Sequence, residues 1–282
     1  MKVMTARSRA IVIRPADAAW LNVRTHLGRL AESGDLLRTL SVHRINVRYR
    51  QTLLGIGWAV LQPLLMMAIF AVVFSRLAQM PSEGAPYALF AYVALLPWTF
   101  FATSVGNATG SLVNHTQLIT KVYFPREVLP LSYIIAALFD FAIGLAALGA
   151  LMAWFHVPVT AATLYLVPVV ALLATWALAV SLLTSAAQVR WRDVGVAMPV
   201  LIQVWMFVSP VIYPLSVVPA SWRPLYLLNP VAGIVNAFRD VLLRGRPPDA
   251  EPLVYAVLVT AITLPLAYLV FKRTEATMAD IV

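Results

Sequence analysis

The chain has 282 residues, of which 61% are hydrophobic and only 12% are charged. Soluble proteins carry about 25% charged residues, so this composition excludes a soluble globular fold and indicates an integral membrane protein. The absence of cysteine excludes disulfides and thiolate metal sites. The length allows one membrane domain of about six spans with a modest cytoplasmic part.

The net charge of +9 is distributed unevenly along the chain. Sixteen of the 21 Lys and Arg residues lie in segments that we expect on the cytoplasmic side, ten of them before residue 53. This asymmetry follows the positive-inside rule and favours attraction to membrane lipids over binding of nucleic acid. Six spans then place both termini in the cytoplasm.

The N-terminal region, residues 1–52, is predicted to be cytoplasmic or interfacial. Its first 14 residues are basic and contain an apolar patch of four residues, too short for a signal peptide. Residues 18–31 carry apolar side chains at steps of three and four, which predicts an amphipathic helix lying in the membrane interface. Gly34 can end that helix, and Asp35 can N-cap the next one.

A basic collar precedes the first apolar run, residues 53–74. The collar consists of Arg48, Tyr49 and Arg50. At about 1.5 Å per residue the run spans roughly 33 Å, enough for a hydrocarbon core of about 30 Å. Gln62 and Pro63 interrupt it, which membranes tolerate where other helices or a water-filled pathway satisfy the freed groups. A kinked structural helix and a span beside a polar substrate both fit this pattern.

The second span is predicted at residues 87–105, and a polar stretch connects it to KVYFPREVLPL at residues 121–131. Pro125 and Pro130 break the helix there, and the charges place this segment in water. We therefore expect a short helix and an elbow on the cytoplasmic side, between the second and third spans.

The third span, residues 129–155, contains Asp140. A carboxylate at membrane depth is costly, so Asp140 should face the bundle and have a partner. It is either an ion or gating site, or a structural residue bonded to hydroxyls or a water molecule.

The remaining spans are predicted at residues 164–187, from about residue 194, and at residues 253–271, with an elbow at residues 190–193. Between the last two, Asn229 and Pro230 form an N-cap and first-turn pair. The helix that follows, residues 231–244, is about 21 Å long and carries charges, so it is too short and too polar to span. We expect re-entrant or interfacial helices on the outer face.

No motif for catalysis is present in the sequence. It lacks a P-loop, a dinucleotide loop, metal-ligand spacing among its four histidines and a Ser-His-Asp set. We therefore predict a chain that is not an enzyme and binds no metal or cofactor itself. ATP-driven transport would need its energy from another chain.

Aromatic side chains are the remaining chemical signal within the predicted spans. The candidates are Trp58, Trp98, Phe101, Trp205 and Phe207. Ring faces stack on the C–H faces of sugars, so these rings, with Gln62, are candidates for a substrate pathway. The alternative is that they fill cores and interfacial belts, as most membrane aromatics do.

RYRQTLLGIGWAVLQPLL at residues 48–65 resembles the opening of the membrane subunit of ABC-2 type polysaccharide exporters, and KVYFPREVLPL resembles a second signature of that family. The likeness extends over roughly residues 36–273. It implies an all-α permease with a six-span domain, residues 53–273, and a cytoplasmic tail, residues 274–282. It further implies export of O-antigen, capsule or teichoic acid chains across the bacterial inner membrane.

The resemblance also implies partners. The working unit would be two copies of this chain with two ATP-binding cassette subunits, which would bind ATP and Mg²⁺. The elbow would dock into the ATPase through Lys121, Val122, Tyr123, Phe124, Arg126 and Glu127. Arg48, Tyr49 and Arg50 would meet the headgroup of an undecaprenyl-diphosphate-linked polysaccharide, since Arg matches phosphate oxygens. An ion-coupled transporter that uses Asp140 stays open as the alternative.

Overall fold

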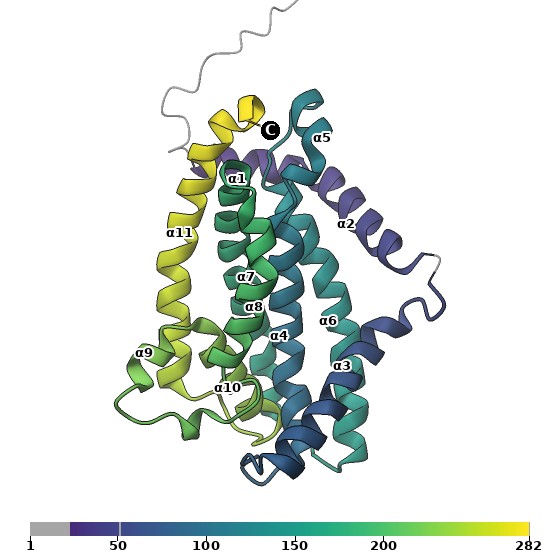
Figure 1. Cartoon of the computed structure of the whole chain (residues 1–282), viewed down its shortest axis with the longest axis vertical. Coiled ribbons are helices and arrows are strands. Elements are labelled where there is room, and N and C mark those ends of the chain that lie inside the picture. Colours follow the sequence, from purple (N-terminus) through teal and green to yellow (C-terminus); the bar gives the residue numbers. More distant parts are fainter. Residues whose placement is uncertain (1–22, 51, 282) are drawn as a thin grey trace, which may run out of the picture.

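The computed structural model describes residues 23–50 and 52–281, which form helices and contain no strand (Figure 1). Within these residues, five helical segments are long and apolar enough to cross a membrane. They are α3 (Gly57–Phe70) with its π-helical extension η2 (Ala71–Leu77), α4 (Tyr87–Thr109), α6 (Val128–Trp154), α7 (Leu166–Arg190) preceded by η4 (Ala161–Tyr165), and most of α11 (Ala250–Ile281). The chain is therefore an all-helical, multi-pass membrane protein.

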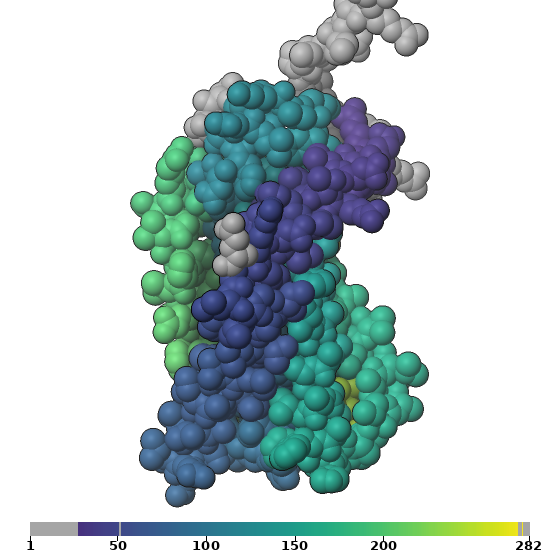
Figure 2. Space-filling model, turned by 90° about the vertical axis from the view of Figure 1, so that its right-hand side faces the viewer, coloured from purple at the N-terminus to yellow at the C-terminus, as the bar shows by residue number. Residues whose placement is uncertain are grey.

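Helix α4 forms the centre of the bundle, where it packs against α3, α6, α7 and α10. It is mostly apolar, and 78% of its most apolar window is buried. A helix of this kind lies inside a large core. By contrast only 11% of the corresponding window of α3 is buried, because α3 lies on the surface of the molecule (Figure 2).

Two helices precede the bundle, α1 (Val23–Glu32) and α2 (Gly34–Tyr49). Figure 1 shows α1 across the end of the bundle that holds the C-terminus, here called the upper end, and α2 descending beside α6. The prediction that Asp35 caps α2 is wrong, since the N-cap residue is Ser33. One residue separates the two helices, so Asp35 already lies inside the first turn. Residues 1–22, which hold part of the predicted amphipathic helix, lie outside the described residues.

The first span begins later than predicted, at Gly57. Residues 53–56 form the turn between α2 and α3, and Gly55 has a φ of 52°. That left-handed conformation suits glycine and reverses the chain. The apolar run alone did not indicate this turn.

The upper end also carries η3 (Val113–His115), α5 (Thr116–Lys121), the turn between α7 and α8 (Asp193–Val208), and the end of α11 (Figure 1). Helix α8 has 16 residues and corresponds to the predicted fifth span. Helix α11 continues through Lys272 and Arg273 to Ile281, beyond the predicted end of the last span.

The opposite, lower end holds η5 (Leu215–Val217), α9 (Arg223–Leu227) and α10 (Pro230–Leu242). The predicted cap of α10 is confirmed, because the Asn229 side chain accepts a hydrogen bond from the Val231 N–H at 3.2 Å. All 13 residues of α10 are buried, including Arg239 and Asp240.

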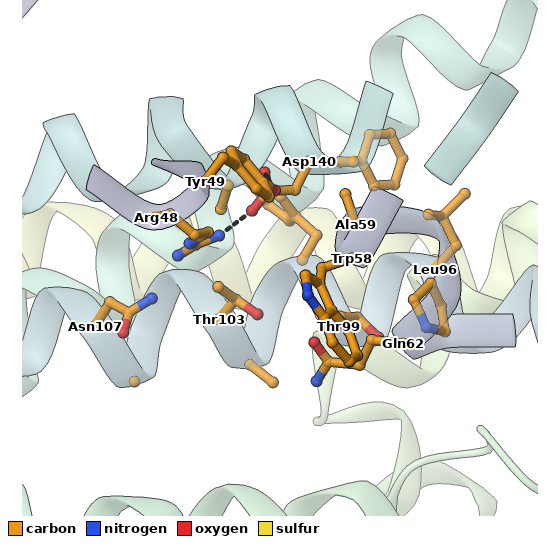
Figure 3. Close-up of a pocket in the computed structure, with 16 residues that line it drawn as sticks. Arg48, Tyr49, Trp58, Ala59, Gln62, Leu96, Thr99, Thr103, Asn107 and Asp140 are labelled. Atoms are coloured by element: carbon orange, nitrogen blue, oxygen red, sulfur yellow. Dashed lines mark hydrogen bonds and ion pairs between the residues drawn. The ribbon is translucent and has the colours of Figure 1, made fainter. Parts of the chain in front are cut away.

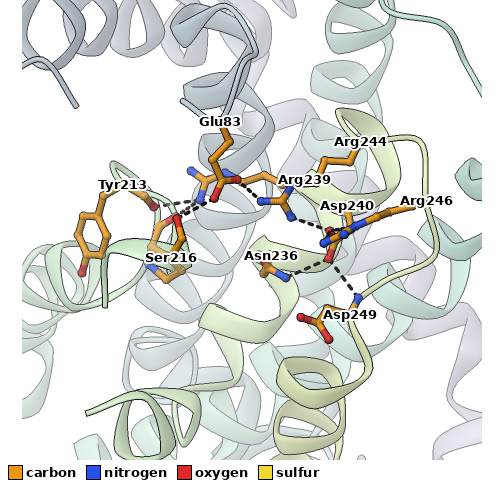
Figure 4. Close-up of polar contacts among 10 residues, drawn as sticks. Glu83, Tyr213, Ser216, Asn236, Arg239, Asp240, Arg244, Arg246 and Asp249 are labelled. Carbon is orange, nitrogen blue, oxygen red and sulfur yellow. Dashed lines mark hydrogen bonds and ion pairs between the residues drawn. The ribbon is translucent and has the colours of Figure 1, made fainter. Parts of the chain in front are cut away.

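The buried charges of α10 are paired within the chain (Figure 4). Arg239 donates to the backbone carbonyls of Pro210, Val211 and Tyr213 at 2.6, 2.9 and 3.0 Å. Asp240 accepts from Arg244 at 2.6 Å. These contacts bond both terminal nitrogens of Arg239 and the carboxylate of Asp240, and they fix the chain between α8 and α10.

Glu83, in the loop between η2 and α4, reaches this cluster from another part of the sequence. It pairs with Arg244 and accepts a hydrogen bond from Ser216 at 2.8 Å (Figure 4). Burial raises the pKa of Glu83, but the hydrogen bonds from Ser216 and Arg244 outweigh burial, so its pKa lies below the ordinary value. Arg246 joins the same group, since its Nε donates to Oδ1 of Asp240 at 2.7 Å.

Candidate functional site: a polar cavity at membrane depth

A cavity of about 510 Å³ lies between the end of α2, the first half of α3, and one face each of α4 and α6 (Figure 3). Its position between spans is unusual for polar groups, because polar side chains at membrane depth are costly unless partnered. Two of its lining residues are charged, Arg48 and Asp140.

The charged residues of the cavity form a three-membered contact. Arg48 donates through Nη1 to Oδ2 of Asp140, and the Tyr49 hydroxyl donates to Oδ1 of the same carboxylate (Figure 3). Burial and the hydrogen bond to Asp140 raise the pKa of Tyr49 to about 12, so Tyr49 stays a protonated donor at neutral pH. Asp140 thus has the hydroxyl partner that the sequence suggested, and also a cationic partner from α2.

One face of α4 adds a stripe of neutral polar groups to the cavity. Thr99, Thr103 and Asn107 follow one another at steps of four residues, which places them on the same side of a helix, and Gly106 widens the space beside them. The sequence analysis missed this stripe. Its signal was the spacing of these three polar residues within an otherwise apolar span.

Helix α3 supplies the facing wall through Trp58, Gln62 and Pro63. Trp58 is 44% exposed, so part of its ring surface is not covered by other residues of this chain. Phe100 and Phe141 pack edge to face, with ring centroids 5.6 Å apart, and close the floor of the cavity. Arg50 follows α2 and is exposed, but it does not line the cavity.

The other predicted pathway rings lie elsewhere. Trp98 and Phe101 are 5% and 0% exposed and belong to the core. Trp205 packs its edge on Phe101, with centroids 5.0 Å apart, and donates from Nε1 to Asn229 Oδ1 at 3.1 Å. Phe207 is 52% exposed on α8. The structure of the single chain therefore does not bring these four rings into the cavity with Trp58.

The predicted elbow divides into an exposed and a buried part. Tyr123 is 90% exposed and Val122 is 50% exposed, immediately after α5, and Lys121 is exposed as well. These side chains form an apolar tip with a flanking cation at the upper end of the molecule.

The second part of the elbow faces its own chain. Phe124 is buried, and Glu127, 4% exposed, pairs with Lys272 of α11 at 2.5 Å. Arg126 donates to the backbone carbonyl of Glu275 at 2.6 Å. These contacts link the elbow to α11 instead of presenting both charges to a partner.

Within residues 23–50 and 52–281, no group of three or more His, Cys, Asp or Glu side chains is placed to hold a metal ion. The helices and the polar cavity define a multi-pass membrane protein that has charged, amide and hydroxyl groups between its spans.

The sequence matches the family described as ABC-2 type transporter over residues 35–243, so the chain belongs to this family. It is 33% identical over 249 residues to an O-antigen export system permease protein of Myxococcus xanthus, which covers 87% of this chain and 94% of the relative. It is 25% identical over 226 residues to a protein of the same description from Klebsiella pneumoniae, covering 80% and 85%. A polysialic acid transport protein of Escherichia coli is 24% identical over 255 residues, covering 86% and 94%. The family resemblance inferred from the two signatures is confirmed.

Proposed function

We propose that this chain is the permease subunit of an ATP-driven exporter of a lipid-linked polysaccharide, in the first place an O-antigen chain. The observation that carries the proposal is the cavity, which combines a cation for a phosphate headgroup with hydroxyl, amide and ring groups suited to sugars. The relatives support the class of cargo, since their descriptions name O-antigen export and polysialic acid transport.

In this proposal the upper end of the bundle faces the cytoplasm of a bacterial inner membrane. Both termini then lie inside, and α8 is an additional crossing, the fifth along the chain, which brings the total to six. Arg48 and Tyr49 receive the diphosphate of an undecaprenyl-diphosphate carrier, while Trp58 and the stripe on α4 contact the sugars that follow.

Two copies of the chain act with two ATP-binding cassette subunits, which bind ATP and Mg²⁺. The exposed tip of the elbow, Val122 and Tyr123, is the part suited to insert into an ATPase subunit. When the ATPase subunit moves the elbow, the ion pair between Glu127 and Lys272 transmits this movement to α11.

A capsular or teichoic acid polymer is the second candidate cargo, favoured by the similarity to the polysialic acid transport protein. An ion-coupled transporter is less well supported, because Arg48 already neutralises Asp140 and leaves little attraction for a cation.

Co-purification tests the proposal. The tagged chain is isolated from its native membrane, and mass spectrometry identifies the proteins and glycolipids bound to it. We expect an ATPase subunit with a P-loop in equal amount and a polyprenyl-diphosphate glycan. A chain that purifies without an ATPase, and whose transport in vesicles follows an ion gradient, would refute it.

A further inference from the structure

Asp140 occupies the position in the cavity where a phosphate oxygen would bind. Both of its carboxylate oxygens are used, one by the Arg48 guanidinium and one by the Tyr49 hydroxyl (Figure 3). A guanidinium beside a hydroxyl donor is a set that binds phosphate as well as carboxylate. We propose that Asp140 is a resident anion that holds Arg48 and Tyr49 until the diphosphate of the substrate displaces it. This inference rests on the proposed function.

The ion pair lies on the wall of the cavity, where a ligand can reach it. The side chains of Arg48 and Asp140 are 34% and 21% exposed. Among the described residues that line the cavity, no other side chain carries a charge, so the resting site is neutral overall. Because both side chains are partly exposed to the cavity, an anion with more charge than a carboxylate can reach Arg48 and compete with Asp140 for it.

The end of α2 can release Asp140 without detaching from the bundle. One turn earlier, Arg44 donates to Ser132 at 2.7 Å and stacks over the Tyr133 ring at 3.4 Å, and both partners belong to α6. This anchor does not involve Asp140. After Tyr49 the helix ends, and the exposed turn at Gly55 leads into α3. Breaking the contacts with Asp140 therefore leaves this anchor of α2 on α6 intact.

A released Asp140 has replacement donors in the same cavity. Thr103 and Asn107 on α4 and Gln62 on α3 line it and carry hydroxyl or amide hydrogens. A diphosphate with two or more negative charges binds Arg48 strongly enough to offset the loss of the ion pair between Arg48 and Asp140. The single phosphate of a zwitterionic phospholipid is screened by its own ammonium group, so it offsets less of that loss than a diphosphate does. Asp140 thus disfavours zwitterionic phospholipids and makes the site selective for ligands that carry two or more negative charges.

Binding of short isoprenoid probes to the purified full chain in nanodiscs tests this role. The probes are farnesyl diphosphate, farnesyl monophosphate and farnesol. We expect Asp140→Asn to bind farnesyl diphosphate about tenfold more tightly than wild type, a change equivalent to roughly 1.4 kcal/mol. It should also bind farnesyl monophosphate, which wild type discriminates against. Arg48→Ala should lose binding of both phosphates, and Asp140→Glu should behave as wild type.

Glu251→Gln is the matched control, because it removes a carboxylate from an exposed ion pair with Arg223 at the lower end, 3.3 Å apart. It should bind all probes as wild type does. Thermal unfolding of each variant checks that the fold persists, and Asp140→Ser replaces Asp140→Asn if the latter unfolds.

The two hypotheses fail in different ways. Suppose that wild type prefers farnesyl diphosphate to farnesol, but Asp140→Asn binds farnesyl diphosphate no more tightly than wild type does. This result would overturn the role of Asp140 and leave the proposed function standing. If neither wild type nor any variant prefers the phosphates, the diphosphate headgroup in the proposed function and this inference both fall.

Discussion

At the scale of single residues, Trp58 differs from the other predicted pathway rings, because its ring lines the cavity and is free on one side. We expect Trp58→Ala to give a stable permease with lowered export, since the change removes a stacking surface without opening the core. Phe or Tyr should restore more export than Leu, because stacking on sugars needs a flat face. The measurement is surface polysaccharide normalised to permease in the membrane. Equal export with Leu and Phe would show that the ring only fills space.

Trp98 provides the contrast to Trp58. It is 5% exposed and packs near Phe101, with ring centroids 5.7 Å apart. Replacing a buried Trp by Ala costs about 3–5 kcal/mol through the cavity left behind. Trp98→Ala should therefore lower the amount of folded protein before export is measured, which Trp58→Ala should not do.

The pair of Glu127 and Lys272 leads to a second prediction. Both side chains are almost fully buried, and removing one partner of a buried pair leaves an uncompensated charge. Glu127→Gln should destabilise the chain by about 3 kcal/mol, the lower end of the usual range, because Lys272 keeps Glu275 at 2.7 Å. Thermal unfolding of the purified chain measures this, and Glu127→Gln with Lys272→Met should recover part of the loss. An unchanged unfolding temperature in Glu127→Gln would contradict the buried pair.

At the scale of elements, the elbow after α5 changes from an exposed to a buried side chain between two consecutive residues. Tyr123 is 90% exposed and Phe124 is 8% exposed. Tyr123→Ala should therefore keep the fold but uncouple ATP hydrolysis from export, while Phe124→Ala should lower stability. Reconstituted complexes measured for ATPase rate and transport distinguish the two effects. Normal coupling in Tyr123→Ala at a normal protein level would show that this tip does not contact the ATPase.

The loop between η2 and α4 makes a pH-dependent contact with the lower end of the molecule. The pKa of Glu83 is lowered in the folded protein, so its contribution is fully present above the ordinary value of 4.5 and is lost as the pH falls through the lower folded pKa. Wild type should lose more thermal stability than Glu83→Gln between neutral pH and a pH below 4. A parallel decline in both proteins would exclude this contact as a source of acid sensitivity.

Much of this arrangement of elements could be predicted, because long apolar runs and proline breaks act locally. The spans, the elbow before Val128 and the cap at Asn229 follow from sequence patterns of this kind. The partners of Asp140 could not be predicted, since Arg48 and Tyr49 lie more than 90 residues earlier in the chain. The inward direction of Glu127 depends on Lys272 of α11, which lies far from the elbow in the sequence.

The sequence indicated that polar and aromatic groups lie beside the first span, but it did not indicate which residues line the cavity. Polar and aromatic residues near the first span indicated a pathway, yet helical spacing does not show which face of a span meets a neighbour. Trp98 and Phe101 therefore turned out to lie in the core, while the stripe of Thr99, Thr103 and Asn107 on the same helix faces the cavity.

At the scale of the whole molecule, the absence of cysteine allows a direct test of topology. Single cysteines are placed at Ser82 and Ser216, in the lower loops, and at Trp191, in the upper turn between α7 and α8. In intact cells a membrane-impermeant thiol reagent should label Cys at 82 and 216 but not at 191, as six crossings require. Labelling at 82 without labelling at 216 would show that α8 does not cross.

The shortness of α8 has a consequence for the surrounding membrane. Sixteen residues rise about 24 Å, roughly 6 Å less than the usual hydrocarbon thickness. Its exposed side chains, Val196, Val200, Val204 and Phe207 among them, are apolar, so this side of the molecule contacts acyl chains or another apolar surface. As the additional crossing that we propose, α8 would thin the bilayer where it contacts acyl chains, at a cost that rises with each ångström of mismatch, unless flanking residues or another chain compensate. A thinner bilayer beside α8 would shorten the path that the headgroup of the proposed lipid carrier has to cross.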